Sequence, residues 1–178
     1  MKKLENELEQ ILNAGKKSDS TNVGLKTTLR NKSLIGLKKK VSGDQFEAQI
    51  GFMASRQGLK CKKIPEGCKR LPGGRIIPIK SPFDFILQSE TMTFFIDAKS
   101  TINDRFNYSQ IDQSQVFSLE YLKNNHSLCG YIINLNETVY FFSVDVLKSC
   151  KPGTSLSRED GTYLGTKTSF NLYLLHEL

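Results

Sequence analysis

The segment SPFDFILQSETMTFFIDAKS (residues 81–100) constrains the fold of this chain more than any other. Large apolar residues alternate with polar ones on both sides of QSET, which is typical of two strands joined by a short loop. If QSET is the loop, Asp84 lies opposite Phe95, and Asp97 is its diagonal neighbour on the same face. Lys99, two residues beyond Asp97, points to that face as well. The sequence therefore predicts a hairpin with three charged groups on one side.

The remaining apolar patterns place this hairpin within a larger sheet. We expect the apolar side of the hairpin, Phe83, Phe85, Leu87, Phe94, Ile96 and Ala98, to face the core. Periodicity predicts helices over 43–58 and 109–125, and strands over 59–64, 83–87, 92–99, 129–135 and 138–144, with an edge strand in FNLYLLHEL at the C-terminus. This order predicts an α/β (α+β) fold, in which a mixed central sheet is flanked by helices.

The length of 178 residues suits one domain with a real core, and eleven Phe and six Tyr supply bulky core material. No stretch approaches the roughly 18 consecutive apolar residues that a bilayer span needs. The N-terminal MKKLENELEQIL places acids where a signal peptide has its apolar region. We expect a cytoplasmic protein with no membrane partner.

The net charge of +7 is concentrated near the N-terminus. Residues 1–42 form a basic arm with ten Lys and Arg against four acids, and the domain proper is expected over residues 43–178. Lys38, Lys39 and Lys40 lie next to the domain, where they can contact a polyanion. The arm therefore predicts nucleic-acid binding, and a solvated tail that only aids solubility is the alternative.

Cysteine and histidine usage limits the possible chemistry. Cys61, Cys68, Cys129 and Cys150 lack the close spacing of zinc ligands, so reduced thiols are favoured over a four-cysteine zinc site. With two histidines in the chain, a histidine-based metal site or a Ser-His-Asp triad is difficult to build.

The charged face of the hairpin suits metal-dependent phosphodiester hydrolysis. Two neighbouring carboxylates repel each other unless a cation lies between them. Oxygen ligands favour a hard ion, so the expected cofactor is Mg²⁺, with Mn²⁺ as an alternative. A neighbouring lysine can orient water or stabilise charge on the phosphate. The alternative is an exposed hairpin face with an ordinary Asp–Lys surface pair.

These residues resemble a known nuclease motif. Pro82-Phe83-Asp84 followed by Ile96-Asp97-Ala98-Lys99 is similar to the PD-(D/E)xK motif. GDQFEAQI, with Gly43, Phe46 and Glu47, resembles the opening helix of RecU-type Holliday junction resolvases, and Phe106, Ile111 and Gln115 fit the pattern that follows the lysine there. The resemblance covers about residues 43–148 and implies a restriction-endonuclease-like core.

The resemblance also implies roles for individual residues. Asp84 and Asp97 would be metal ligands, Gln115 would lie near the ion, and Lys99 would stabilise the transition state. Glu47 on the opening helix would approach the same site as a further catalytic acid. Three positions depart from the resolvase pattern: Asp97 replaces the usual Glu, Pro82 replaces a Thr, and Ser114 replaces a His.

Residues 65–82 contain four of the five prolines and four cationic side chains. In the resemblance they correspond to a projecting stalk, in which Lys69, Arg70, Arg75 and Lys80 would contact phosphates. A mobile surface loop is the alternative, although the apolar run IIPI indicates some pairing or packing.

The sequence therefore favours a Mg²⁺-dependent structure-specific DNA endonuclease. A homodimer that resolves four-way junctions by paired symmetric nicks, in recombination and repair, fits best. Two alternatives stay open: another PD-(D/E)xK nuclease of restriction or exonuclease type, and a non-catalytic basic nucleic-acid-binding protein.

Overall fold

The structure is a computed structural model that describes residues 42–178. The predicted basic arm, including Lys38, Lys39 and Lys40, lies outside the described residues except for Ser42. None of the helices in the described part is long and apolar enough to cross a membrane.

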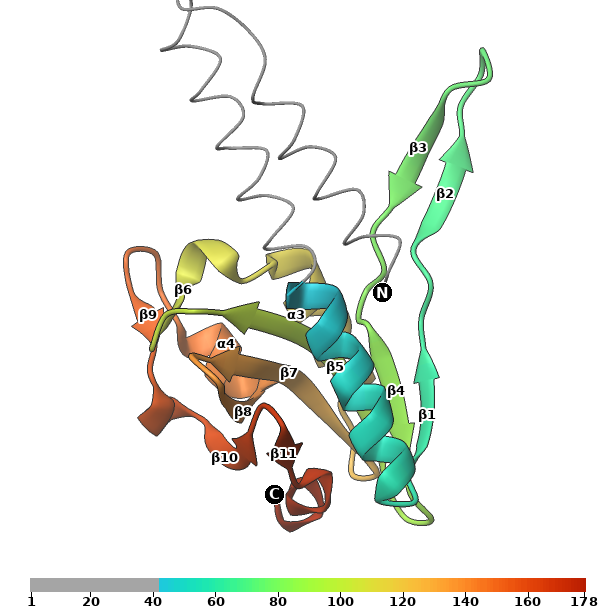
Figure 1. The fold of residues 1–178 in the computed structure, drawn as a ribbon. Helices are drawn as coiled ribbons and strands as arrows, with labels where there is room; N and C mark the ends of the chain where they lie inside the picture. The colour runs from blue at the N-terminus through green and yellow to red at the C-terminus, as the bar shows by residue number, and fades with distance from the viewer. Residues whose placement is uncertain (1–41) are drawn as a thin grey trace, which may run out of the picture. The chain divides into compact units, whose positions relative to one another are not determined.

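A seven-stranded mixed sheet is the centre of the described domain (Figure 1). Its strands, in spatial order, are β1 (Lys60–Lys63), β4 (Phe85–Gln88), β5 (Thr93–Thr101), β7 (Ser127–Leu135), β8 (Thr138–Ser143), β10 (Thr162–Thr166) and β11 (Ser169–Phe170). β5 and β7 are parallel, and the other neighbouring strands are antiparallel. The predicted mixed sheet is confirmed.

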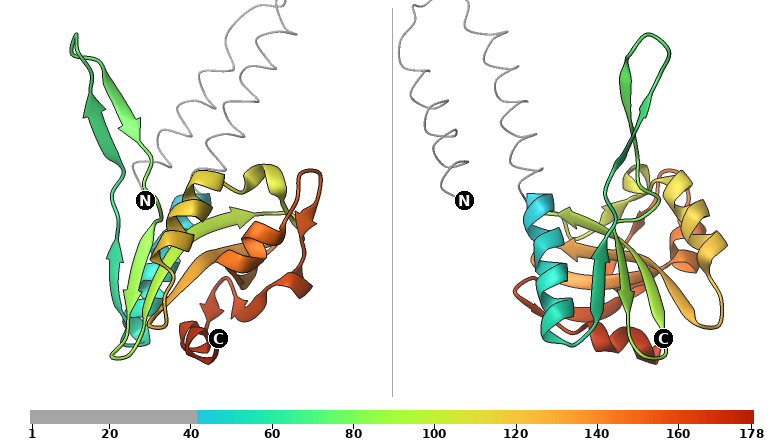
Figure 2. Two further views of the ribbon diagram at one scale, coloured as in Figure 1. Left: turned by 180° about the vertical axis from the view of Figure 1, so that it is seen from behind. Right: turned by 90° about the vertical axis from the view of Figure 1, so that its right-hand side faces the viewer.

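Helices cover both faces of this sheet (Figure 2). A helix over residues 42–56 and the 3₁₀ helix η3 (Leu172–Glu177) pack on one face, whereas α3 (Gln113–Leu122) and α4 (Val144–Ser149) pack on the other. The central strands β7 and β8 are almost continuously buried, because neither of their faces meets water. Two short strands, β6 (Phe106–Asn107) and β9 (Ser155–Leu156), pair outside the main sheet, and the 3₁₀ turns η1 (Tyr108–Gln110) and η2 (Arg158–Asp160) lie beside them in the chain.

The 42–56 helix follows the predicted apolar stripe. Phe46, Ile50 and Met53 are buried against the sheet, and the chain leaves the helix through Gly58, whose φ of +71° is a left-handed conformation that suits glycine. The second predicted helix, α3, is shorter than expected at its start. Asp112 caps it by accepting from the Ser114 and Gln115 backbone N–H groups, so the regular helix begins at Gln113.

The hairpin of β4 and β5 forms, but its register differs from the prediction. Gln88 pairs with Thr93, so the loop is Ser89–Met92, one residue later than QSET. Ser89 causes the shift, since its hydroxyl accepts from the backbone N–H groups of Thr91 and Met92 at 3.3 and 3.0 Å. Asp84 therefore lies opposite Asp97, not opposite Phe95.

One residue of the predicted apolar side lies on the wrong face. Phe85, Leu87, Phe94, Ile96 and Ala98 pack with the 42–56 helix as expected. Phe83 packs in the opposite core, with its ring 5.2 Å from that of Phe95. The chain bends at Pro82 and again at Asp84, and this bend breaks the strand alternation before β4 begins.

Residues 65–82 contain a second, two-stranded sheet that projects from the domain (Figures 1 and 2). Strand β2 (Gly67–Arg70) pairs with β3 (Ile76–Ile79), so the apolar run IIPI is paired, as the sequence indicates. Gly73 and Gly74 form the tip with positive φ values of 88° and 80°. We call this hairpin, residues 65–82, the projecting arm.

The predicted C-terminal edge strand is largely wrong. Of FNLYLLHEL, Phe170 alone belongs to a strand, and Leu172–Glu177 forms η3. The Asn171 side chain accepts from the Tyr173 N–H and starts the turn, while Leu172 and Leu175, three residues apart, are buried together. The spacing of these two leucines matches a 3₁₀ helix and does not match a strand.

Candidate active site

Asp84 and Asp97 meet where β4 and β5 pair. The Asp84 carboxylate reaches across to β5 and accepts from the Ala98 backbone N–H at 2.8 Å. Asp97 points to the α3 side of the sheet and is completely buried. The backbone between Asp97 and Lys99 therefore holds the first acid beside the second.

Lys99 lies two residues after Asp97, and its side chain points to the same face of the sheet. Its ammonium forms an ion pair with Oδ2 of Asp97 and lies 5.3 Å from the centre of the Tyr131 ring. A cation over an aromatic face is attracted by the ring's negative centre. Tyr131 reaches this position because it pairs with Asp97 in the parallel β5–β7 register.

Gln115, the third residue of α3, contacts the site from the face of the sheet on which α3 packs. Its Nε2 donates to Oδ1 of Asp97 at 2.6 Å and to the Ser81 carbonyl at 3.3 Å. The side chain is 3% exposed, which is unusual for a glutamine. The structure thus brings together Asp84, Asp97, Lys99 and Gln115.

Burial dominates the electrostatics of Asp97. Loss of water is the main cause that raises the pKa of this carboxyl to about 7; the charge of Lys99 opposes the rise, and the negative charge of Asp84 adds to it. Oδ2 of Asp97 also has no hydrogen-bond donor of suitable geometry among the described residues, although Lys99 lies close to it. Lys99 pairs with Asp97, and the negative charge of Asp84 acts against the ionisation of Asp97, so the site favours a further positive charge.

This pKa predicts an unusual stability profile for the metal-free protein. The folded-state pKa of Asp97 is raised from the ordinary 3.8, so the contribution of this carboxyl to stability is fully present below about pH 4 and is lost as the pH rises towards 7. Asp97→Asn removes this cost. We expect it to stabilise the protein at pH 8 by roughly 2–4 kcal/mol, and by much less at pH 4.5.

Urea denaturation in the presence of EDTA, at both pH values, measures this difference. Asp145→Asn is the matched control, because Asp145 is an exposed acid in a surface ion pair with Lys123 and its loss should have little effect at either pH. Equal stability of the wild type and the Asp97 variant at pH 8 would contradict the pKa assignment.

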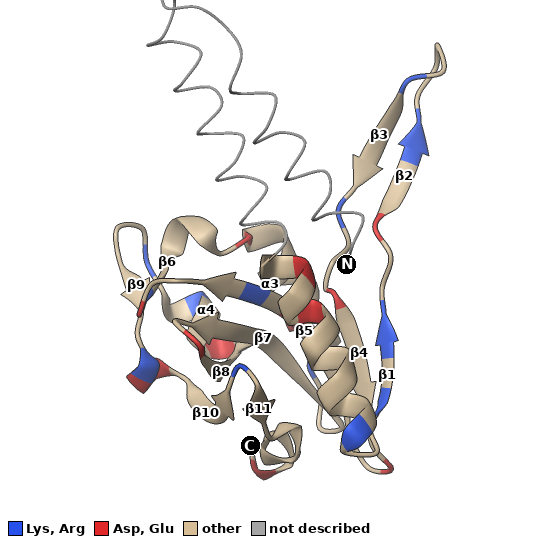
Figure 3. Ribbon diagram, viewed as in Figure 1, with Lys and Arg blue, Asp and Glu red and all other residues tan. Residues whose placement is uncertain are grey.

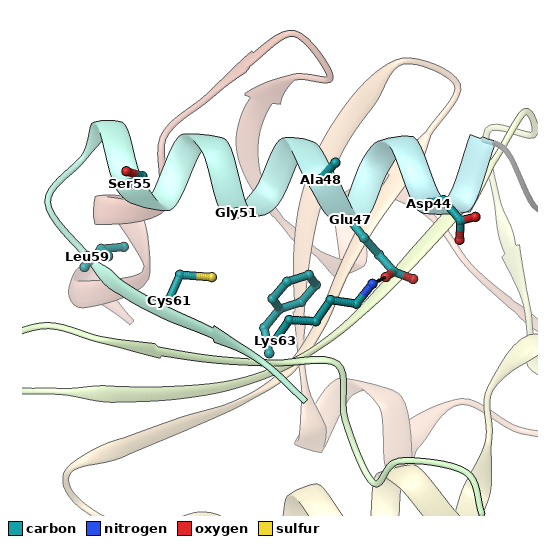
Figure 4. Close-up of a pocket in the computed structure, with 9 residues that line it drawn as sticks. Asp44, Glu47, Ala48, Gly51, Ser55, Leu59, Cys61 and Lys63 are labelled. Carbon is teal, nitrogen blue, oxygen red and sulfur yellow. Dashed lines mark ion pairs between the residues drawn. The ribbon is translucent and has the colours of Figure 1, made fainter. Parts of the chain in front are cut away.

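Glu47 lies apart from these four residues. It forms an ion pair of 2.6 Å with Lys63 and lines a cavity of about 510 Å³ between the 42–56 helix and β1 (Figure 4). Hydrogen bonding to Glu47 is the main reason that the Lys63 pKa is raised, and Asp44 and Asp84 contribute through their charge. Phe85, which also lines the cavity, faces the opposite side of the β4–β5 pair from Asp97. The cavity is therefore not the carboxylate site.

No group of three or more His, Cys, Asp or Glu side chains within residues 42–178 is arranged to hold a metal ion. Glu47 thus does not complete a cluster with the two aspartates. The four cysteines, all in the described part, are free thiols, of which Cys61 and Cys68 are exposed.

The predicted DNA-contacting residues divide into two groups. Lys69, Arg70 and Arg75 are exposed on the projecting arm (Figure 3). Lys80, at the root of the arm, forms an ion pair with Asp112, which raises the Lys80 pKa and lowers the Asp112 pKa.

The sequence interpretation missed Ser81, Asp112 and Tyr131. Asp112 carries a recognisable signal, since an Asp immediately before a helical pattern is a typical N-cap. Ser81 and Tyr131 carry none, because their roles depend on how α3 and β7 are placed against β5.

No protein-family model matches this sequence, and no curated protein sequence matches it. The fold does match a solved structure, Archaeoglobus fulgidus Hjc, a Holliday junction resolvase from an archaeal hyperthermophile. The two structures share a TM-score of 0.51 and 15% sequence identity, and the match covers 68% of this chain and 95% of Hjc. The chain therefore shares the fold of Hjc.

Proposed function

We propose that this protein is a metal-dependent DNA endonuclease that cuts four-way junctions. The observation that carries the proposal is the meeting of Asp84, Asp97, Lys99 and Gln115 at one point of a resolvase-like fold. The PD-(D/E)xK resemblance of the sequence implies roles for the same four residues. A surface Asp–Lys pair does not explain a fully buried acid, so it is the weaker interpretation.

The residues present fit a Mg²⁺ site, with Mn²⁺ as the alternative ion. Asp84 and Asp97 would hold the ion and Gln115 would lie beside it, with water and substrate phosphate completing an oxygen shell. The Oδ2 atom of Asp97, which has no hydrogen-bond donor of suitable geometry among the described residues, and the raised pKa of this carboxyl support this fit. When bound, such an ion polarises the phosphodiester and lowers the pKa of a bound water.

Lys99 has a different role in this proposal. Its ammonium neutralises part of the charge on Asp97 and is one quarter exposed, so it can also face a phosphate group. There it would stabilise the negative charge that develops on the phosphate oxygens. The Tyr131 ring limits where the ammonium can move.

Two paired cuts in a two-fold symmetric junction require two sites, which a homodimer supplies. α3 offers a surface for a second copy, because Phe117 and Tyr121 lie one turn apart and are 71% and 84% exposed. Large apolar side chains gathered on a surface often mark interfaces.

The deciding experiment is incubation of the protein with labelled four-way junctions and linear duplexes, with and without Mg²⁺. We expect paired nicks near the crossover, on opposing strands, that leave ligatable 5′-phosphates. Equal cutting of linear duplex would favour a restriction-type nuclease, and degradation from an end would favour an exonuclease. Binding without cleavage under any condition would favour a non-catalytic nucleic-acid-binding protein.

The basic arm of residues 1–42 yields a separate prediction. Because its excess charge would act by releasing counterions from DNA, removal of residues 1–41 should weaken binding to all sequences similarly. The slope of log affinity against log salt should become shallower by about 0.9 for each phosphate that the protein no longer neutralises. Fluorescence anisotropy over a salt series measures the slope, and an unchanged slope would show that the arm does not contact DNA.

A further inference from the structure

The root of the projecting arm contacts the candidate active site through two consecutive residues. Lys80 and Ser81 follow the last residue of β3 and precede Asp84 by only a few positions. Both contact α3, the helix that carries Gln115. The arm and the carboxylate pair are thus connected through space as well as along the chain.

Lys80 acts on the start of α3. Its ammonium pairs with Oδ2 of Asp112, the N-cap residue. The other oxygen, Oδ1, accepts from the Ser114 N–H at 2.9 Å and from the Gln115 N–H at 3.4 Å. One carboxylate therefore joins the arm root to the first turn of the helix.

Ser81 acts on the Gln115 side chain. Its carbonyl accepts from Nε2 of Gln115, whose other hydrogen is directed to Asp97. Ser81 is itself buried, and its hydroxyl donates to the Phe83 carbonyl at 2.5 Å, which fixes the local backbone. Both the backbone and the side chain of Gln115 are thus held by the Lys80–Asp112 and Ser81 contacts.

We infer that Lys80 and Asp112 are positioning residues, which hold the Gln115 amide against Asp97 and so connect the projecting arm to the active site. Lys80 is then not a phosphate contact, in contrast to the expectation from its charge. The catalytic part of this inference rests on the proposed function. The contacts that link Lys80 and Asp112 to Gln115 are a property of the folded protein alone.

The linkage can be measured on the metal-free protein by NMR of the Gln115 side-chain amide. Lys80→Ala and Asp112→Ala should shift and broaden its two resonances, because the amide loses its fixed orientation, whereas Lys80→Arg should preserve them. Lys148→Ala is the matched control, since Lys148 forms a comparable surface ion pair with Glu120 on the same helix. Unchanged Gln115 resonances in Lys80→Ala, in a protein that folds normally, would overturn the inference.

Two further measurements test whether Lys80 affects metal-dependent cleavage and whether it contacts DNA. Lys80→Ala should raise the Mg²⁺ concentration for half-maximal cleavage by about three- to fivefold, the size expected for one ion pair of modest strength, and Lys80→Arg should restore it. The salt dependence of DNA binding by Lys80→Ala should equal that of Lys148→Ala. If the slope of log affinity against log salt became shallower in Lys80→Ala alone, Lys80 would contact phosphate, which would contradict its assignment as a positioning residue. If no DNA is cleaved, the proposed function fails while the NMR result still decides the linkage.

Discussion

Asp84→Asn and Asp97→Asn are each expected to abolish Mg²⁺-dependent DNA cleavage. A metal ion contributes several kcal/mol to the stabilisation of a phosphoryl transition state, so loss of one carboxylate ligand should reduce the rate by roughly three orders of magnitude. Lys99→Ala should lose cleavage by about 10²–10³-fold through a different cause, the loss of charge stabilisation, and should still bind the metal. Single-turnover cleavage of a labelled junction measures the rates, and calorimetry measures metal binding.

DNA binding distinguishes these losses from unfolding. Removal of a carboxylate from a protein of net charge +7 does not weaken its attraction to phosphate, so the two Asn variants should bind junctions as well as the wild type does. Asp97→Asn should also be more stable than the wild type without metal, because the cost of the buried charge is gone. Asp145→Asn, which alters an exposed ion pair, serves as the control for cleavage. Full cleavage by both aspartate variants would remove the basis of the proposed function.

The sequence predicted which charged residues share one face of the hairpin better than it predicted how these residues pair. Alternation identified the hairpin and put Asp84, Asp97 and Lys99 on one face, but the register depended on the Ser89 turn, which a count of residues cannot locate. The corrected register brings Asp84 directly opposite Asp97. The two acids are therefore closer partners than the diagonal arrangement implied.

Other contacts could not be predicted because they join distant parts of the chain. Gln115 was singled out by resemblance, but its hydrogen bond to Asp97 exists because α3 packs on the β5–β7 face. Tyr131 lies under Lys99 because β7 pairs with β5 in parallel. The Lys80–Asp112 ion pair depends on both the path of the arm and the start of α3. The pattern of neighbouring residues in the sequence carries little information about any of these long-range contacts.

Substitution of the projecting arm is expected to remove most of the preference for junctions over linear duplex. The metal site addresses one phosphate and has no means to distinguish these substrates, so the preference must arise elsewhere. Gly67 and Ile79 pair across the arm, and replacement of residues 68–78 by Asn-Gly would join them through a two-residue hairpin turn. This change removes Lys69, Arg70 and Arg75 but keeps Lys80 and Ser81, so the bonds from the arm root to α3 should persist.

The shortened variant should lose roughly an order of magnitude in the ratio of junction to duplex cleavage, with little change in the Mg²⁺ dependence. A second variant, in which Lys69, Arg70 and Arg75 are replaced by Gln, keeps the arm but removes its charge. If electrostatic attraction alone gives the preference, both variants should lose it equally, and the salt slope of binding should become shallower by about 2.7, because three phosphates are no longer neutralised. If the shape of the arm also matters, the shortened variant should lose more than the Gln variant. An undiminished junction preference in the shortened variant would show that the arm does not recognise the junction and would leave the spacing of two sites in a dimer as the source of specificity.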